Sequence, residues 1–378
     1  MGVFLRTGGD FLRLVCNFSP MISFGGVQVE TIVVVMTVLL VGVATYTILG
    51  GMLSVLITDF LQFVVMSVGL ILVTVLILMN SGVGWDRLVT TVEEHFGAGG
   101  FNPFVNKELG WSYVVFNLLV NTAAVLTWQT AVARVLAAKD SKTGMKVYTR
   151  TSFFFVCRFL IPGIWGIAAL AVLGSNVPDG NPLYAMPKFL AGFVPIGLMG
   201  ILIAAMLAAD MSTDSSYMLT WGSVIYNDIL RPFRKTAWSD RKGLVANRFI
   251  IAAIGVFLFF FGLWYNPPGD LWNYLTVTGS IYLTSMSTLL IAACYWKRAN
   301  DWGAAAAIVV GAAVPVITLV LQKVGPWQKE FVANESGWGI TAYVLCWAAM
   351  IAGSLLKPPQ DRPMVRSATP SATTGGDR

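Results

Sequence analysis

The chain has 378 residues, of which 56% are hydrophobic and only 12% charged, and its mean hydropathy is +0.71. A soluble domain usually carries about 25% charged residues, so this composition excludes an ordinary soluble protein and indicates a membrane protein. The net charge of +6 could suggest a nucleic-acid-binding surface, but the basic residues lie where a membrane topology places them.

Residues 1–24 come first along the chain, and Arg6, Asp10 and Arg13 interrupt their apolar run. We interpret this segment as the second half of a helix. A membrane-spanning helix needs about 20 mostly apolar residues, and the stretches that follow meet this requirement. They are 30–48, 55–79, 111–136, 150–173, 191–228, 246–265, 272–296, 303–322 and 338–356. The alternation typical of membrane-spanning strands is absent, so we predict an all-α polytopic membrane protein with about nine spanning helices.

The apolar stretches and the polar segments between them form a transmembrane domain over 25–356, and a tail follows. Residues 80–110 are predicted to form a short surface helix, and 174–190 a turn-rich loop. Residues 229–246 are a basic connection. The tail, 357–378, is rich in Pro, Ser, Thr and Gly and is predicted to be a disordered cytoplasmic tail.

Basic residues are concentrated in alternate loops, and cytoplasmic loops of membrane proteins carry the excess of Lys and Arg. The rich set predicts that both termini and the loops at 137–149 and 229–246 are cytoplasmic, in a plasma (inner) membrane. The poor set predicts that 80–110 and 174–190 lie outside. The rich set is Arg134, Lys139, Lys142, Lys146, Arg150, Arg231, Arg234, Lys235, Arg241, Lys242, Arg248, Lys297, Arg298, Lys357, Arg362, Arg366 and Arg378; the poor set is Arg87, Lys107, Lys188, Lys323 and Lys329.

Metal and nucleophile chemistry finds little support in the sequence. The four cysteines sit singly in apolar stretches, and His95 is the only histidine. Zinc sites and Ser-His-Asp triads need clusters of such residues. We therefore expect no enzyme, no organic cofactor, no nucleic acid and no protein partner of known kind.

Ala209, Ser212 and Thr213 are the most informative polar group in an apolar stretch. Their spacing places them on one helical face, where two hydroxyls and a carbonyl freed by a local distortion at Ala209 would offer oxygen ligands to a small cation. Alternatively, the two hydroxyls only bond back to the preceding helical turn.

Asp210 and Asp214 lie in the same stretch. A carboxylate at the centre of a membrane costs roughly 2.5–3.5 kcal/mol on insertion scales. Both residues must therefore face protein or water, carry a proton, or lie near a solvated helix end. All three options place this helix on a polar pathway; a solvated helix end with no further role is the alternative.

Four segments of the chain resemble motifs of the sodium:solute symporter family, in that family's order. They are YTILGG at 46–51 with TDFLQ at 58–62, QTAVARVLAAKD at 129–140, AADMST at 208–213 with YNDI at 226–229, and YWKRAN at 295–300 with GA at 303–304.

The resemblance implies a LeuT-like fold of two inverted five-helix repeats, with sites at broken helices near the membrane midplane. Residues 30–48 would be the fourth core helix, 55–79 the fifth and 272–296 the tenth, and 1–24 would be part of the third. The first core helices are then absent, so we expect a fragment of a full symporter that does not concentrate a solute alone.

The resemblance also implies roles for single residues. Ala209, Ser212 and Thr213 would bind Na⁺, the coupling ion. Asp59, in the TD pair, and Asp210, where the family usually has an apolar residue, would lie along the ion pathway. Asp59 could equally be a solvated carboxylate at a helix end, and Asp210 could admit proton coupling.

Weaker matches fall on Asn121, Arg158 and Thr276, which would contact the solute. Asn121 could instead form an interhelical hydrogen bond, and Thr276 could mark close helix packing. Gln129 and Arg134 are interpreted as structural residues at a helix end.

Sodium-coupled symport of a small organic solute is the function that these observations favour. A non-transporting remnant or a membrane interaction subunit is the alternative, because helices of the family fold are missing. The solute is left open among proline, sugars, carboxylates and vitamins.

Overall fold

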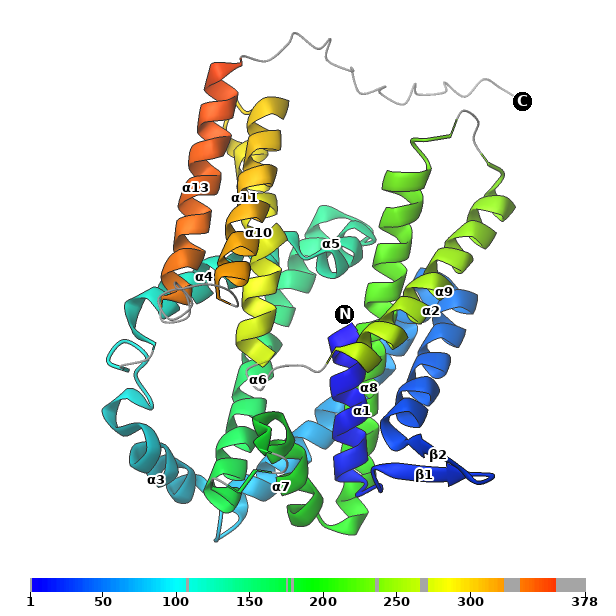
Figure 1. Ribbon diagram of the computed structural model, residues 1–378, viewed down its shortest axis with the longest axis vertical. Helices are drawn as coiled ribbons and strands as arrows, with labels where there is room; N and C mark the ends of the chain where they lie inside the picture. The colour runs from blue at the N-terminus through cyan, green and yellow to red at the C-terminus, as the bar shows by residue number, and fades with distance from the viewer. Residues whose placement is uncertain are drawn as a thin grey trace, which may run out of the picture. The chain divides into compact units, whose positions relative to one another are not determined.

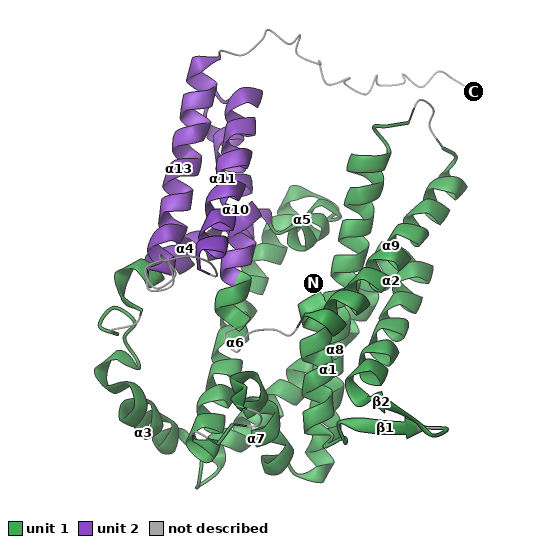
Figure 2. Cartoon of the chain, in the orientation of Figure 1, with its two compact units in different colours: residues 1–114, 128–275 green, residues 115–127, 276–378 purple. Residues whose placement is uncertain are grey.

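The computed structural model describes residues 2–106, 109–174, 176–177, 180–234, 238–265, 271–322 and 334–357 (Figure 1). Within these ranges it is helical apart from one small hairpin, and eight helices are long and apolar enough to cross a membrane. The chain divides into two compact units (Figure 2). Unit 1 comprises Met1–Val114 and Trp128–Leu275, and unit 2 comprises Val115–Thr127 and Thr276–Arg378.

Helix α8 (Ile196–Val224), which carries Ala209, Ser212 and Thr213, lies at the centre of the packing of unit 1. Helices α1, α2, α5 and α9 all contact α8. The elements of this unit are α1 (Gly2–Val15), β1 (Met21–Phe24), β2 (Val27–Glu30), α2 (Thr31–Met79), α3 (Trp85–Phe96), η1 (Gly97–Gly99), α5 (Gln129–Leu136), α6 (Ser141–Leu173), η3 (Pro182–Tyr184), α7 (Ala185–Phe193), α8 (Ile196–Val224), η4 (Ile225–Leu230) and α9 (Asp240–Trp264).

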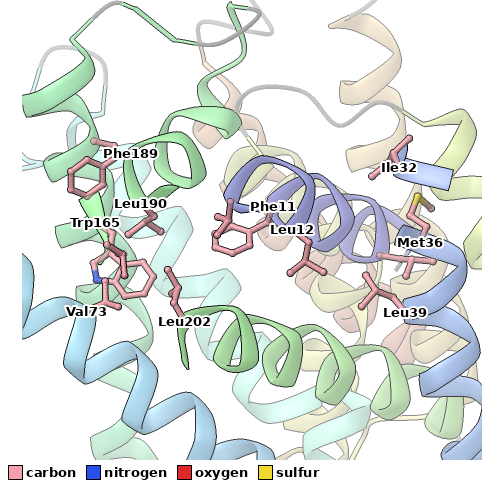
Figure 3. Packing of buried hydrophobic residues seen from close by; sticks show 14 of the residues in the cluster. Phe11, Leu12, Ile32, Met36, Leu39, Val73, Trp165, Phe189, Leu190 and Leu202 are labelled. Carbon is pink, nitrogen blue, oxygen red and sulfur yellow. The ribbon is translucent and has the colours of Figure 1, made fainter. Parts of the chain in front are cut away.

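Buried apolar side chains from several of these helices form one continuous cluster. Figure 3 shows Phe11 and Leu12 of α1 near Leu202 of α8, and Met36 of α2 on the far side of α1. Trp165 of α6 is 1% exposed, and its indole N–H donates to the hydroxyl of Thr74 at 3.0 Å. The cluster fixes α8 against its neighbours.

The stretches predicted at 30–48 and 55–79 form one continuous element, α2, of 49 residues. This length suffices for two spans. The element is interrupted at Gly51, where φ is 60° and ψ is −153°, a conformation that glycine adopts without a steric penalty. The expected pair of helices is therefore present, joined through a kink.

Two other predicted helices are divided by the structure. The stretch 111–136 becomes α4 (Gly110–Thr127) and α5, separated at Trp128, whose backbone is extended (φ −65°, ψ 115°). The stretch 191–228 is divided between the end of α7, at Phe193, and α8, which begins at Ile196 after Pro195 in an extended conformation. Both breaks leave the first amide groups of the next helix without helical acceptors.

The beginning of the chain differs from the expected helix over 1–24. Helix α1 ends at Val15, and residues 21–30 form an antiparallel hairpin in which Phe24 pairs with Val27 across a two-residue turn. The turn is Gly25–Gly26, with φ angles of 56° and 89°, as such two-residue turns require. The helix predicted within residues 1–24 therefore ends at Val15, and a short hairpin that was not predicted follows it.

The predicted surface helix within 80–110 is α3. At the start of α6, the Asp140 carboxylate accepts the Thr143 N–H, and this bond lowers the pKa of Asp140. Several positions used in the topology and tail predictions lie outside the described residues. They are Lys107, Lys235, Lys323, Lys329 and residues 358–378.

Unit 2 contains most of α4, most of α10 (Leu271–Tyr295), α11 (Asp301–Leu321) and α13 (Glu335–Leu356). The side chain of Asn300 joins the start of α11 to the end of α13. Its Oδ1 accepts the Gly303 N–H at 3.0 Å, and its Nδ2 donates to the carbonyls of Ser354 and Lys357 at 3.0 and 2.6 Å.

Replacing Asn300 by Ala should destabilise unit 2, because a lost helix N-cap costs about 0.5–2 kcal/mol. Asn300→Asp keeps the capping oxygen and loses the two amide donors, so it should fall between the wild type and Asn300→Ala. Thermal unfolding of the three purified proteins in one detergent would measure this order. Equal melting temperatures for Asn300→Ala and the wild type would contradict it.

Candidate functional site

Ala209, Ser212 and Thr213 lie on one face of α8, as their spacing predicted. The hydroxyl of Ser212 donates to the Ala209 carbonyl at 3.1 Å, and that of Thr213 donates to the same carbonyl at 2.9 Å. Three oxygens thus gather at one point inside a membrane-spanning helix. The lone pairs of both hydroxyls remain available to a cation.

The expected distortion at Ala209 is not found, since α8 is an uninterrupted α-helix from Ile196 to Val224. Both hydroxyls donate to the Ala209 carbonyl in its helical position, so this carbonyl has hydrogen-bond partners without being displaced from the helix. This bonding to the preceding turn is the geometry that the alternative reading predicted. A cation here would be bound by hydroxyl lone pairs first.

The next turn of α8 extends the polar face toward α2 and α5. The hydroxyl of Ser216 donates to the Ser212 carbonyl at 2.6 Å and receives a hydrogen bond from Arg134 at 2.5 Å. The same guanidinium nitrogen lies 2.5 Å from the carboxylate of Asp59. Arg134 therefore links Asp59 on α2 to Ser216, one turn from the candidate cation ligands.

Arg134, interpreted from the sequence as a structural residue, forms an ion pair with Asp59 at a half-buried position, with side-chain exposures of 27% and 21%. Nothing in the sequence indicated this partner. The second oxygen of Asp59 is buried and has no hydrogen-bond partner among the described residues. An ion arriving at Asp59 would meet this free carboxylate oxygen and also the positively charged guanidinium of Arg134.

Asp214 is buried and Asp210 is half-buried in the middle of α8, so neither is a carboxylate at a solvated helix end. Asp214 is 0% exposed, and neither of its carboxylate oxygens has a hydrogen-bond partner in the described part of the chain. The Oδ2 atom of Asp210 is likewise buried without a partner there. This placement contradicts the reading of a water-exposed helix terminus.

The three residues matched weakly to a solute site lie on three different helices, α4, α6 and α10. The Arg158 side chain is exposed on α6, with its guanidinium 5.2 Å from the centre of the Phe155 ring. Asn121 donates to the Asn117 carbonyl of its own helix at 2.8 Å, and Thr276 is buried on α10. Arg158 belongs to unit 1 and the other two to unit 2.

Known proteins resemble the chain over most of its length. The sequence profile of the Sodium:solute symporter family matches residues 23–311. The osmoregulated proline transporter OpuE of Bacillus subtilis is 26% identical over 334 residues, which cover 85% of this chain and 62% of that protein. The sodium/mannose cotransporter SLC5A10 of Bos taurus is 25% identical over 370 residues, which cover 86% and 62%. The chain thus spans under two thirds of the length of these relatives.

One solved structure shows the fold. A Na⁺-coupled sialic acid symporter, in a substrate-bound outward-open state, superimposes with a TM-score of 0.70 at 21% identity and covers 95% of this chain and 73% of its own. This likeness confirms the all-α, LeuT-like membrane fold. At this identity it says nothing of the solute.

The Asp59–Arg134 pair should contribute measurably to stability, because removing one partner leaves the other charge half-buried. A double-mutant cycle with Asp59→Asn and Arg134→Gln should give a coupling energy of about 1–3 kcal/mol by chemical denaturation. The exposed Arg87–Glu94 pair, 48% and 54% exposed, is the internal control and should couple by about 0–1 kcal/mol. Equal coupling energies in the two pairs would contradict the prediction that the Asp59–Arg134 ion pair stabilises the protein more than an exposed ion pair does.

Proposed function

The chain belongs to the sodium:solute symporter family, and we propose that it takes part in sodium-coupled symport of a small organic solute across a plasma membrane. The single observation that carries this proposal is the gathering of the Ala209, Ser212 and Thr213 oxygens inside a spanning helix. The family and the relatives are transporters, which also argues against an enzyme. The protein is an integral, multi-pass membrane protein.

Hydroxyl and carbonyl oxygens are hard ligands of the kind that alkali and alkaline-earth cations take in proteins. Set in a low-dielectric helix bundle, they replace part of the ion's water shell. In this proposal α8 supplies one side of the sodium site, and Asp59 and Asp210 lie along the ion's route. Ion binding can drive transport only if it favours one conformation over another, so the site must be completed by groups that move relative to α8.

The solute is proposed only as a class. The names of the relatives include proline and mannose transporters, and we propose a small polar organic solute of this range. Asn121, Arg158 and Thr276 remain the proposed contacts.

Removing either hydroxyl should raise the sodium requirement for transport. A lost oxygen ligand in a buried site typically costs about 1–3 kcal/mol, so Ser212→Ala or Thr213→Ala should raise the half-activating sodium concentration roughly fivefold to a hundredfold. Sodium-dependent uptake by cells expressing the protein from its gene, over a panel of amino acids, sugars, carboxylates and vitamins, is the measurement.

Thr37→Ala is the matched control for these variants. Thr37 also bonds back to its preceding turn, at 2.6 Å from the Val33 carbonyl, but is exposed on the outer side of α2. Its loss should leave sodium activation unchanged. If the α8 variants behave like Thr37→Ala, the hydroxyls are only structural. If no solute enters in a sodium-dependent manner, the proposed function fails.

The orientation that we propose places both termini inside the cell. In a background without the four native cysteines, Arg241→Cys should resist an impermeant thiol reagent in intact cells, and Lys188→Cys should react, because the richly basic loops face the cytoplasm. Both positions are exposed. Reaction at position 241 but not at 188 would reverse the orientation.

A further inference from the structure

The connection between α8 and α9 carries positive charge that no carboxylate described in the structure neutralises through an ion pair. The candidate spans on its two sides end at Leu230 and begin at Asp240, so the connection lies at the membrane boundary. Between positions 229 and 248 the described residues include one acidic side chain, that of Asp240, and five basic ones. The basic residues are Arg231, Arg234, Arg241, Lys242 and Arg248.

Arg234 is oriented by two aromatic rings. Its Cζ atom lies 3.4 Å from the centre of the Trp238 ring and 5.0 Å from the centre of the Tyr226 ring. The Tyr226 hydroxyl in turn packs so closely on Gly243 of α9 that a Cβ added there would collide with it. Rings contact a guanidinium on its faces, whereas its N–H donors point outward in its plane. The rings therefore orient the Arg234 side chain without using its donors.

One of these donors lacks a partner. The Nη2 atom of Arg234 is buried and forms no hydrogen bond with any residue that the structure describes. A buried donor left unsatisfied is costly, and more so when it carries charge. The planar fork of a guanidinium matches two oxygens of a phosphate group. The geometry of Arg234 thus favours a phosphate as its ligand.

Exposed apolar side chains border this arginine. Phe233, the preceding residue, is 86% exposed, and Trp238 is 45% exposed. Tryptophan is enriched at membrane interfaces, where one part of the ring meets hydrocarbon and another meets water. A soluble phosphate compound would leave Phe233 without apolar contacts. A phospholipid offers a phosphate to Arg234 and acyl chains to Phe233.

We propose that Arg234, oriented by Trp238 and Tyr226, binds the phosphate group of an anionic phospholipid at the membrane boundary of α8 and α9. The exposed basic side chains of Arg231 and Lys242 favour a headgroup with net negative charge over a zwitterionic one, as basic clusters beside spanning helices do. This inference does not rest on the proposed transport function.

Native mass spectrometry of the purified chain in detergent, titrated with dioleoylphosphatidylglycerol, tests the proposal. The wild type should bind the first molecule of this lipid about tenfold more tightly than dioleoylphosphatidylcholine; equal affinities would overturn the proposal. Arg234→Gln should weaken this binding about tenfold or more, because charge-assisted hydrogen bonds are lost. Arg234→Lys keeps the charge but not the planar fork, so it should weaken binding nearly as much. Binding by Arg234→Lys at the wild-type affinity would overturn the assignment of the phosphate to this guanidinium.

Arg150→Gln is the matched control, because Arg150 is an exposed basic residue of α6 outside this connection. It should bind phosphatidylglycerol as the wild type does; a loss equal to that of Arg234→Gln would overturn the proposal in favour of overall charge. Glycerol 3-phosphate, which has a phosphate but no acyl chains, should not displace the lipid at equal concentration. Full displacement would show that a soluble phosphate compound is the ligand. Melting temperatures without lipid establish that each variant is folded.

Discussion

Hydrocarbon offers a membrane helix no hydrogen-bond partner, so each polar group in a span must find one inside the protein. The chain meets this constraint mainly with short local bonds. Thr37, Thr45 and Thr74 each donate to the carbonyl four residues earlier, and the hydroxyls of α8 donate to carbonyls three or four residues earlier. Against this background the unsatisfied carboxylate oxygens of Asp59, Asp210 and Asp214 stand out. These residues lie on α8 and on α2, which contacts α8.

The membrane helices could be predicted from the sequence because hydropathy over 20 residues is a strong signal, but their interruptions could not. The breaks at Gly51, Trp128 and Pro195 are changes of backbone angle within apolar segments, and apolar composition does not report on them. The hairpin was missed for a related reason. Its Gly25–Gly26 turn, with strand-forming Ile22, Val27 and Val29 around it, is a recognisable signal. It was missed because the first strand was included in the partial helix at 1–24 and residues 25–29 were left as the connection to the next helix.

The candidate site could be predicted only as far as it is local. Spacing along one helix is enough to place Ala209, Ser212 and Thr213 together, and it does. The pairing of Arg134 with Asp59 joins residues 75 positions apart, and nothing in the spacing of either predicts it. The solvation of Asp214 was undecided for the same reason: whether a carboxylate meets water or another helix depends on the tertiary packing of α1.

The Asp59–Arg134 pair has a consequence for how the membrane voltage acts on the protein. An elementary charge that crosses the whole membrane exchanges about 2.3 kcal/mol per 100 mV with the field. A carboxylate matched to a guanidinium carries no net charge, so the field does almost no work on that pair when it moves as a unit. A cation that displaced Arg134 from Asp59 would pair with the carboxylate and leave the arginine charge uncompensated. The ion-bound group would then carry one net positive charge on which the membrane voltage acts, whereas the empty group carries none.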